Sequence, residues 1–373
     1  MNQNQDPQEK REIPLAKEES LSEPVPAAPP GKKSWLFTLL FLLIAALTLW
    51  AVTSQIKDFS LSDFAGYVGN AVPGWLIAAG ACMIGFILFE ALALLSIIRS
   101  FGYRKRLRNG FFYSAGDIYF SAITPSASGG QPASAYFMIK DGIPGTVTAV
   151  SLVANLVMYT LSILAIALIC LLFRPRLFLQ FNTFSRVLIV IGIAVQVLLA
   201  AFFILLLKRE RILHRICDAL LRFLSRLHLL RRPEEKREKL RLYMEDYARY
   251  AQMLKGRGKM MLTAFLFNFL QRASQIAVTA FVYLATGGDP ARVFDIWVLQ
   301  GFVVLGSNCV PIPGAMGVSD YLMLDCYSGI LSASEAGHLE LLSRSVSFYI
   351  CILICGIAVL VKYLMLRKRR NRL

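Results

Sequence analysis

Residues 72–98 read VPGWLIAAGACMIGFILFEALALLSII, an apolar stretch in which Glu90 is the one charged residue. A helix of about 20 apolar residues is long enough to span the hydrocarbon core of a bilayer. Five further stretches are similarly long and apolar, and they lie at 34–53, 144–173, 186–207, 260–286 and 341–366. The pattern predicts an all-α polytopic membrane protein.

The composition of the whole chain agrees with this fold class. Of its 373 residues, 56% are hydrophobic and only 17% are charged, whereas about a quarter of a soluble domain is charged. The mean hydropathy is +0.55. These values exclude a soluble enzyme, an outer-membrane barrel and a nucleic-acid-binding domain, so no nucleic-acid partner is expected.

The basic residues are concentrated in a few segments between the apolar stretches. Lysine and arginine outnumber the acidic residues by 40 to 24, which gives a net charge of +16. Most of the excess lies in 99–108, 208–259 and 367–373. Because positively charged loops stay in the cytoplasm, both termini are predicted to be cytoplasmic. The three arginines of 174–186 oppose this scheme and are outweighed by 208–259.

Two hydrophobic units, 111–140 and 291–332, do not fit as simple crossings. Both are interrupted by Pro and Gly, and each must enter and leave on one side if the basic segments are to stay in the cytoplasm. Irregular backbone at membrane depth is tolerated where it is buried in protein or lines a wet cavity. The sequence therefore predicts six transmembrane helices and two re-entrant hairpins.

The two interrupted units resemble each other when the first is shifted along the sequence so that Gly129 falls on Gly314. At this shift, which we call the repeat offset, identical Ser, Tyr and Met residues follow in both units. The same offset superimposes the apolar stretches on either side. The chain then divides into membrane repeats at 34–173 and 186–366 with opposite orientation, which is typical of alternating-access carriers.

Three segments lie outside this repeated membrane core. Residues 1–33 are polar and rich in proline, and they are predicted to form a disordered cytoplasmic tail. The basic loop 208–259 interrupts the second repeat on the cytoplasmic side. A short basic cytoplasmic tail, 367–373, ends the chain.

The interruptions supply the first set of candidate substrate-binding residues. In each unit the chain breaks at Pro and Gly and restarts as a helix, with Pro132 predicted at the first helical position. A helix N-terminus with open N–H groups attracts phosphate and other anions. The alternative is a purely structural kink. The candidates are Thr124, Ser126, Ser128, Gly129, Gly130, Gln131, Pro311, Pro313, Gly314, Gly317 and Asp320.

Ionisable residues within apolar stretches supply the second set. Glu90 lies in 72–98 and Arg272 in 260–286, and charged residues inside a membrane mark functional sites by default. We expect these two side chains to pair or to share a polar cavity. Asp117 precedes the first interruption, and Lys140 and Asp141 follow it at an expected interfacial position.

No cofactor, metal site or catalytic constellation is predicted. The seven cysteines are odd in number and lack a Cys-x-x-Cys motif, and the three histidines are scattered. No Ser/His/Asp set or pair of catalytic carboxylates has supporting context, so an enzymatic active site is not expected in this chain.

The segments Thr124–Pro132 and Pro311–Gly317 resemble those of the lysylphosphatidylglycerol synthase/flippase proteins, the multiple peptide resistance factor family. The resemblance is to their integral-membrane half and covers roughly 34–366. It implies a multi-pass protein of a bacterial-type plasma membrane that moves an anionic or aminoacylated phospholipid, or a lipid-linked substrate, between leaflets. The second segment departs from the family pattern at Ala315, which stands where a second Gly is usual.

Two other functions stay open: phosphatidylglycerol lysyltransferase activity, by this chain alone or with a separate soluble partner, and transport of a small anion. In full-length members a soluble C-terminal domain transfers lysine from lysyl-tRNA to phosphatidylglycerol, which gives resistance to antimicrobial peptides. The longest soluble stretch here, 208–259, is too short for a domain of ordinary size, so a separate soluble synthase is one expected partner. A second copy of the chain, in a homo-oligomer, is the other.

Overall fold

The computed structural model describes residues 66–124, 127–209, 215, 218–219, 233–308, 310 and 317–370. The elements assigned in this part are helical. The predicted tail 1–33 and helix 34–53, much of the loop 208–259, and the candidate residues Ser126, Pro311, Pro313 and Gly314 lie outside it.

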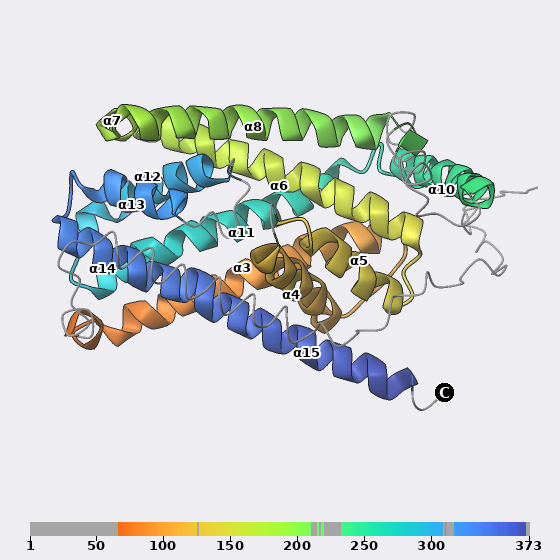
Figure 1. Cartoon of the computed structure of the whole chain (residues 1–373), viewed down its shortest axis with the longest axis horizontal. Helices are drawn as coiled ribbons and strands as arrows, with labels where there is room; N and C mark the ends of the chain where they lie inside the picture. The colour runs from red at the N-terminus through yellow and green to blue at the C-terminus, as the bar shows by residue number, and fades with distance from the viewer. Residues whose placement is uncertain are drawn as a thin grey trace, which may run out of the picture. The chain divides into compact units, whose positions relative to one another are not determined.

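The longer helices are α3 (Pro73–Ser100), α6 (Gly145–Phe173), α8 (Thr183–Lys208), α11 (Gly258–Ala285) and α15 (Cys351–Arg370), together with α10 (Pro233–Met253), which is more polar and lies in the predicted basic loop. The shorter ones are α4 (Leu107–Ile123), α5 (Gly130–Lys140), α7 (Pro175–Gln180), η2 (Pro290–Arg292), α12 (Val293–Ser307), α13 (Val318–Tyr327), α14 (Ala333–Arg344) and the π-helical η4 (Ser345–Ile350). Helices α3, α6, α8 and α11 match predicted apolar stretches to within a few residues, whereas the stretch 341–366 is divided among α14, η4 and α15 (Figure 1).

Local sequence explains where several helices begin. Pro73 starts α3, where the N–H group that proline lacks has no helical partner. The Asn182 side chain caps α8 by accepting a hydrogen bond from Ser185 N at 2.8 Å. Ser332 and Glu335 form a capping box at the start of α14.

Four described helical segments are long and apolar enough to cross a membrane: 73–100, 145–173, 183–208 and 334–368. Helix α11 is as long as α3 but carries the buried polar residues Asn268, Gln271 and Arg272. The chain is therefore an all-helical, multi-pass membrane protein. The layout of six crossings with two re-entrant hairpins remains a prediction.

Helices α3 and α11 lie side by side and antiparallel along their whole length. At one end the backbone N–H of Val72 donates to Ala285 O at 2.7 Å, and the rings of Trp75 and Phe281 stack 5.8 Å apart. At the other end the Arg257 guanidinium donates to the Ser100 carbonyl. This pair forms the centre of the described bundle (Figure 1).

The helix bounds follow the repeat offset seen in the sequence. Shifting the bounds of α3 by this offset gives those of α11, and shifting α4 gives 292–308, which agrees with α12 to within one position at both ends. The neighbours correspond as well. Helix α4 packs on α3, α5 and α15, and α12 packs on α11, α13 and α6.

The interrupted units each consist of two short helices that pack together. Helices α4 and α5 have 17 and 11 residues, and α12 and α13 have 15 and 10. At 1.5 Å per residue the longest of them is about 25 Å, which is shorter than a hydrocarbon core of about 30 Å. None of these four helices is long enough to cross a membrane by itself.

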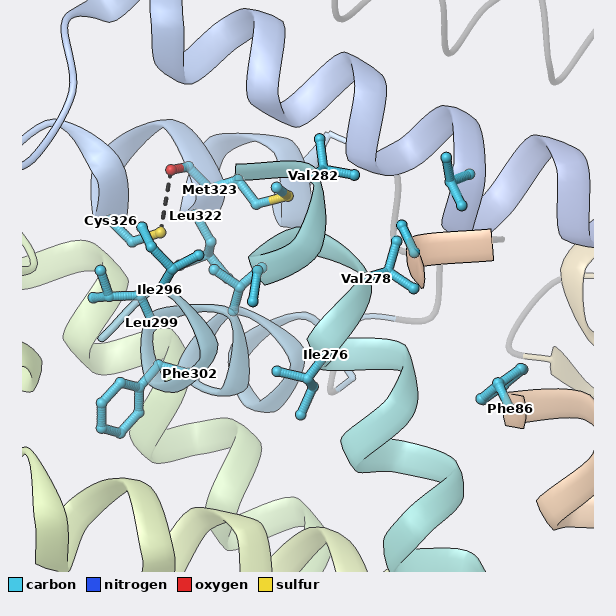
Figure 2. Packing of buried hydrophobic residues seen from close by; sticks show 14 of the residues in the cluster. Phe86, Ile276, Val278, Val282, Ile296, Leu299, Phe302, Leu322, Met323 and Cys326 are labelled. Atoms are coloured by element: carbon cyan, nitrogen blue, oxygen red, sulfur yellow. Dashed lines mark hydrogen bonds between the residues drawn. The ribbon is translucent and has the colours of Figure 1, made fainter. Parts of the chain in front are cut away.

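The largest hydrophobic core joins α11, α12 and α13 to the neighbouring helices (Figure 2). Ile276, Leu299, Phe302 and Leu322 are each at most 1% exposed. Burial of a large apolar side chain contributes about 1.5–3 kcal/mol in water, whereas close packing supplies most of the attraction between helices within lipid. The core thus fixes the second interrupted unit against α11.

Two lysine side chains from distant parts of the sequence meet at Asp141, the residue after α5. Lys105 Nζ donates to the Asp141 carbonyl at 2.6 Å. The Lys362 ammonium, in the second half of α15, forms a buried ion pair with the Asp141 carboxylate at 2.7 Å. Asp141 therefore joins the end of the first interrupted unit to α15, and its interfacial position in the membrane remains a prediction.

Candidate functional site

A cavity of about 740 Å³ lies between the two interrupted units. Its walls come from α3, α4, α5, α6, α8, α11, α12, α13, α14 and η4. Apolar side chains such as Phe86 and Val195 share the lining with polar ones. Its charged lining residues are Glu90, Asp117, Arg272 and Arg344.

Glu90 and Arg272 both line this cavity and are 6% and 7% exposed. The Glu90 carboxylate accepts a hydrogen bond from Gln271 Nε2 at 2.9 Å. The Arg272 guanidinium donates to the Tyr159 hydroxyl and to the Gln275 side-chain oxygen, and it lies 4.8 Å from the centre of the Tyr159 ring. The structure thus brings the two predicted residues into one cavity.

Asp117 is a third ionisable residue of this wall, and it was not among the candidate substrate-binding residues. Its carboxylate accepts hydrogen bonds from Gln131 Nε2 at 2.8 Å and from Ser121 Oγ at 3.2 Å. Its carboxyl group is also in hydrogen-bonding contact with that of Glu90. The candidate Gln131 therefore lines the cavity by holding Asp117 in place.

Gly130 is buried at the closest approach of α5 to α4. A Cβ atom at this position would lie 2.0 Å from Asp117 Oδ1 and from Ser121 Oγ, and 2.7 Å from the Asp117 carbonyl oxygen. Real Cβ contacts are never this short, so only glycine allows the two helices to pack here. Gly130 thereby allows Asp117 to lie at the start of α5.

The start of α5 differs from the expected phosphate cradle in two respects. Pro132 is the third helical residue, not the first. The Gly129 N–H donates to Thr124 Oγ1 at 2.8 Å. The prediction of an open N–H group at Gly129 is therefore wrong, because the Thr124 hydroxyl caps the helix. Ser128 is exposed beside it.

The start of α13 is also capped from within the chain. Gly317 has φ of +78°, which glycine adopts at little cost. Its N–H donates to Asp320 Oδ2 at 2.9 Å, and Asp320 is 1% exposed. Asp320 thus serves as the cap of its own helix. Its partners in the candidate motif, Pro311, Pro313 and Gly314, lie outside the described residues.

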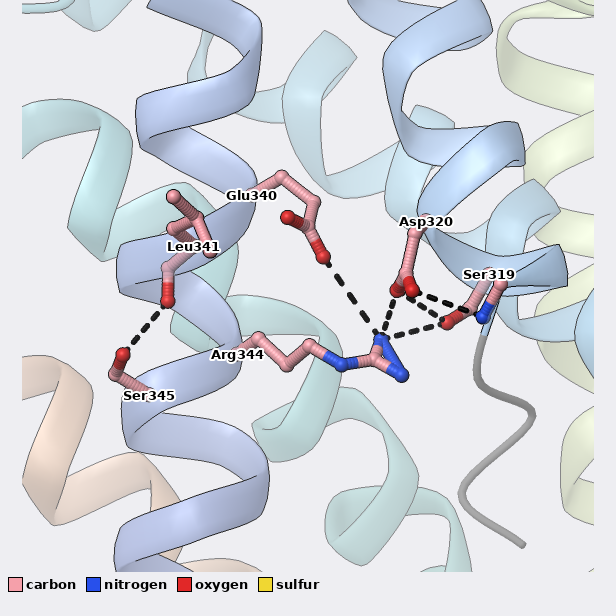
Figure 3. A network of polar contacts seen from close by, with 7 residues as sticks. Ser319, Asp320, Glu340, Leu341, Arg344 and Ser345 are labelled. Atoms are coloured by element: carbon pink, nitrogen blue, oxygen red, sulfur yellow. Dashed lines mark hydrogen bonds and ion pairs between the residues drawn. The ribbon is translucent and has the colours of Figure 1, made fainter. Parts of the chain in front are cut away.

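A second buried charge cluster surrounds Arg344, which sequence reasoning missed (Figure 3). The guanidinium forms an ion pair with Asp320 and donates to Ser319 Oγ at 2.7 Å, and Glu340 Oε1 lies 3.9 Å away. The repeat offset carries Tyr159, the partner of Arg272, onto Arg344. The place of Arg344 inside the apolar stretch 341–366 was the signal available in the sequence.

The helix carrying Arg344 changes geometry at the cavity. The π-helical turn η4 begins directly after Arg344, and its residues Ser347 and Phe348 line the cavity. Single π turns inside α-helices are rare and occur frequently at functional sites. Here the turn joins α14 to α15.

Several buried polar atoms on the cavity wall have no hydrogen-bond partner among the described residues. They are Gln196 Oε1, Asn268 Oδ1, Gln271 Oε1 and Arg272 Nε. Each of these residues is at least 93% buried. A buried polar atom without a partner is costly, so a ligand or water with donors and acceptors would be stabilised at these positions.

The described residues offer no obvious metal site. No group of three or more His, Cys, Asp and Glu side chains is arranged there to hold a metal ion. Cys351 and Cys355, which share a helix face, are buried free thiols.

Comparison with known proteins places the chain among integral membrane proteins. A family model described as the lysylphosphatidylglycerol synthase TM region matches residues 36–355. A "UPF0104 membrane protein" of Archaeoglobus fulgidus is 21% identical over 327 residues, which are 85% of this chain and 95% of the relative. No solved structure matches the chain significantly. The chain belongs to the family of the lysylphosphatidylglycerol synthase TM region.

Proposed function

We propose that this protein is a lipid translocase, which moves an anionic or aminoacylated phospholipid, or a lipid-linked substrate, between the leaflets of the membrane. The observation that carries the proposal is Arg272, a buried guanidinium on the wall of a cavity between two interrupted helical units. Charged side chains inside membrane segments mark substrate and ion pathways.

The hydrogen-bond partners of Arg272 support an anionic ligand, because none of them is an acidic side chain. Its two acceptors, the Tyr159 hydroxyl and the Gln275 amide oxygen, are neutral, and its Nε has no partner among the described residues. Arg344, in contrast, is held by the carboxylate of Asp320. A phosphate entering the cavity would therefore bind Arg272 without first breaking an ion pair to it.

The size and the mixed lining of the cavity suit a lipid head group. A volume of about 740 Å³ lies within the range of small-molecule pockets, about 300–1,000 Å³. Glu90 and Asp117 lie on the same wall as Arg272. Carboxylates near a guanidinium suit a head group that carries both a phosphate and an ammonium group, as an aminoacylated phospholipid does.

The repeated helix bounds support an alternating-access mechanism. Helices α3 and α11 correspond at the repeat offset and run antiparallel, as the matching helices of an inverted repeat do. In transporters built in this way the substrate site lies between the repeats near the membrane midplane. We infer both termini to be cytoplasmic from the basic segments, and the location to be a plasma membrane.

Reconstitution into vesicles with fluorescent phospholipids of different head groups tests the proposal. We expect the full chain to accelerate movement of anionic or aminoacylated lipid, and Arg272→Gln to slow it by about tenfold or more, because a bond to a charged group contributes about 1.5–3 kcal/mol. Arg292→Gln is the matched control, since Arg292 is exposed outside the cavity. The proposal fails if the chain moves no lipid, or moves only small anions.

The family name also raises lysyl transfer to phosphatidylglycerol as a second activity. An isolated-protein assay with lysyl-tRNA and phosphatidylglycerol vesicles separates it from translocation. Lysylated lipid formed by this chain alone would favour the transferase. Lysylated lipid formed only when a soluble synthase is added would make that synthase a partner.

A further inference from the structure

We propose that the carboxyl groups of Glu90 and Asp117 together hold one exchangeable proton, and that this proton drives movement of the head group bound by Arg272. The inference rests on the proposed translocase function and adds to it a source of energy. Its basis is a juxtaposition of two carboxyl groups, one from α3 and one from α4, on the wall of the cavity.

The contact between the carboxyl groups requires a proton. They are within hydrogen-bonding contact of each other, and neither can donate unless it is protonated. Two carboxylates in direct contact do not both ionise, because the like charges repel in a site of low dielectric. The favourable arrangement is one carboxylic acid whose O–H donates to the other carboxylate.

The other hydrogen bonds of Glu90 and Asp117 are compatible with one shared proton. Gln271 Nε2 donates to Glu90, and Gln131 Nε2 and Ser121 Oγ donate to Asp117. These are neutral donors, which stabilise a single negative charge and supply no compensating cation. The pair therefore carries one charge when protonated once and two charges when the proton leaves.

Two unpartnered atoms beside the pair point to exchange with a ligand in the cavity. Gln271 Oε1 has no donor among the described residues although Gln271 is 2% exposed, and Arg272 Nε has no acceptor there although Arg272 is 7% exposed. An unpaired acceptor favours hydronium or an ammonium group, and an unpaired guanidinium N–H favours an anion. Both ligand types meet beside the shared proton.

The charged and titratable groups around Glu90 and Asp117 explain how loss of the proton would affect phosphate binding by Arg272. Arg272 on α11 interacts electrostatically with Glu90, as does the buried thiol of Cys355 on α15, and Tyr159 on α6 lies beyond Arg272. Loss of the proton adds a negative charge next to Arg272. The guanidinium is then drawn to the carboxylates and releases phosphate, and uptake of the proton frees it to bind phosphate again.

Infrared titration of the purified full chain tests the shared proton without any lipid substrate. We expect the wild-type chain to show the carbonyl absorption of a buried carboxylic acid that disappears with rising pH. Glu90→Gln and Asp117→Asn should each remove the same part of this absorption, because the two carboxyl groups hold a single proton, and any part that both variants retain belongs to the buried Glu340 and Asp320. Asp295→Asn is the matched control, since its ion pair with Arg174 is exposed.

Two independent acids would behave differently from a shared proton. Each variant would then remove only its own part of the absorption, and that result overturns the inference, as does a wild-type chain without such a component. Glu340→Gln identifies any absorption from the second buried acidic pair, Glu340 and Asp320, which are 0% and 1% exposed, so that the remainder is assigned to Glu90 and Asp117.

Transport in vesicles of phosphatidylcholine and phosphatidylglycerol tests the coupling. With one proton moved per lipid, a gradient of one pH unit shifts the final distribution of fluorescent phosphatidylglycerol by up to about tenfold. We expect this response in the wild type and its loss in Asp117→Asn. A wild-type distribution that ignores the gradient overturns the coupling. A chain that moves no lipid at all refutes the translocase instead, and the infrared result still decides whether the pair shares a proton.

Discussion

Replacement of Arg344 by glutamine tests whether the buried charge cluster holds the second interrupted unit in place. Arg344 is 7% exposed, and its partners Asp320 and Glu340 are 1% and 0% exposed. The variant leaves two acidic side chains buried without their guanidinium. Removal of one partner from a buried ion pair costs about 3–5 kcal/mol, so we expect Arg344→Gln to lower the free energy of unfolding by about that amount.

The chain offers a matched control with the same chemistry. Arg174 Nε and Asp295 Oδ1 are 2.5 Å apart, and the two side chains are 47% and 28% exposed. Exposed pairs contribute about 0–1 kcal/mol, so Arg174→Gln should destabilise little. Denaturant titration in detergent micelles measures both variants, and Asp320→Asn combined with Arg344→Gln should recover part of the loss. Equal destabilisation by the two single arginine variants would refute the reasoning.

Two further substitutions test the packing of the first interrupted unit. Gly130→Ala should lower the melting temperature, with a cost of about 1–3 kcal/mol for overpacking, because its Cβ would lie 2.7 Å from the Asp117 carbonyl oxygen. Gly145→Ala should leave the melting temperature unchanged, since nothing lies within 4 Å of that Cβ. Equal melting temperatures for the two variants would argue against the close approach of α5 to α4. Lys362→Met should leave the Asp141 carboxylate buried without its cation and should therefore lower the melting temperature. The double variant Asp141→Asn with Lys362→Met should lower it less, because it removes both charges. A larger loss in the double variant would contradict a buried pair.

Most of the fold could be predicted from local sequence. The ends of α3 and α11 follow from the apolar stretches and from Pro73, because helix length and hydropathy are properties of contiguous residues. The repeat offset was visible from a few identities, and the helix bounds agree with it. The polar residues of α11 were visible too, and Arg272 lines the same cavity as Glu90.

The details of the site depended on contacts between distant segments. Thr124 caps Gly129, and Asp320 caps Gly317. Such caps depend on how the chain turns back, which the composition of the motifs did not reveal. The role of Gly130 likewise depends on the approach of α5 to α4.

The buried charge network was the part least accessible to sequence reasoning. Arg344 lies near the start of an apolar stretch, where a basic residue is also compatible with an interfacial position. Its partners Asp320 and Ser319 lie on another helix, α13. Sequence spacing alone could not bring these residues together.

Thiol labelling of two positions on α8 tests most directly whether lipid passes through the cavity. Val195 lines the cavity, whereas Leu198 is 69% exposed on the outer surface of the described bundle. In vesicles, a bulky thiol reagent should stop translocation of anionic phospholipid by Val195→Cys and leave that by Leu198→Cys unchanged, with the wild type reporting the effect on the native cysteines. Continued translocation by the fully labelled Val195→Cys protein would contradict a lipid pathway through the cavity.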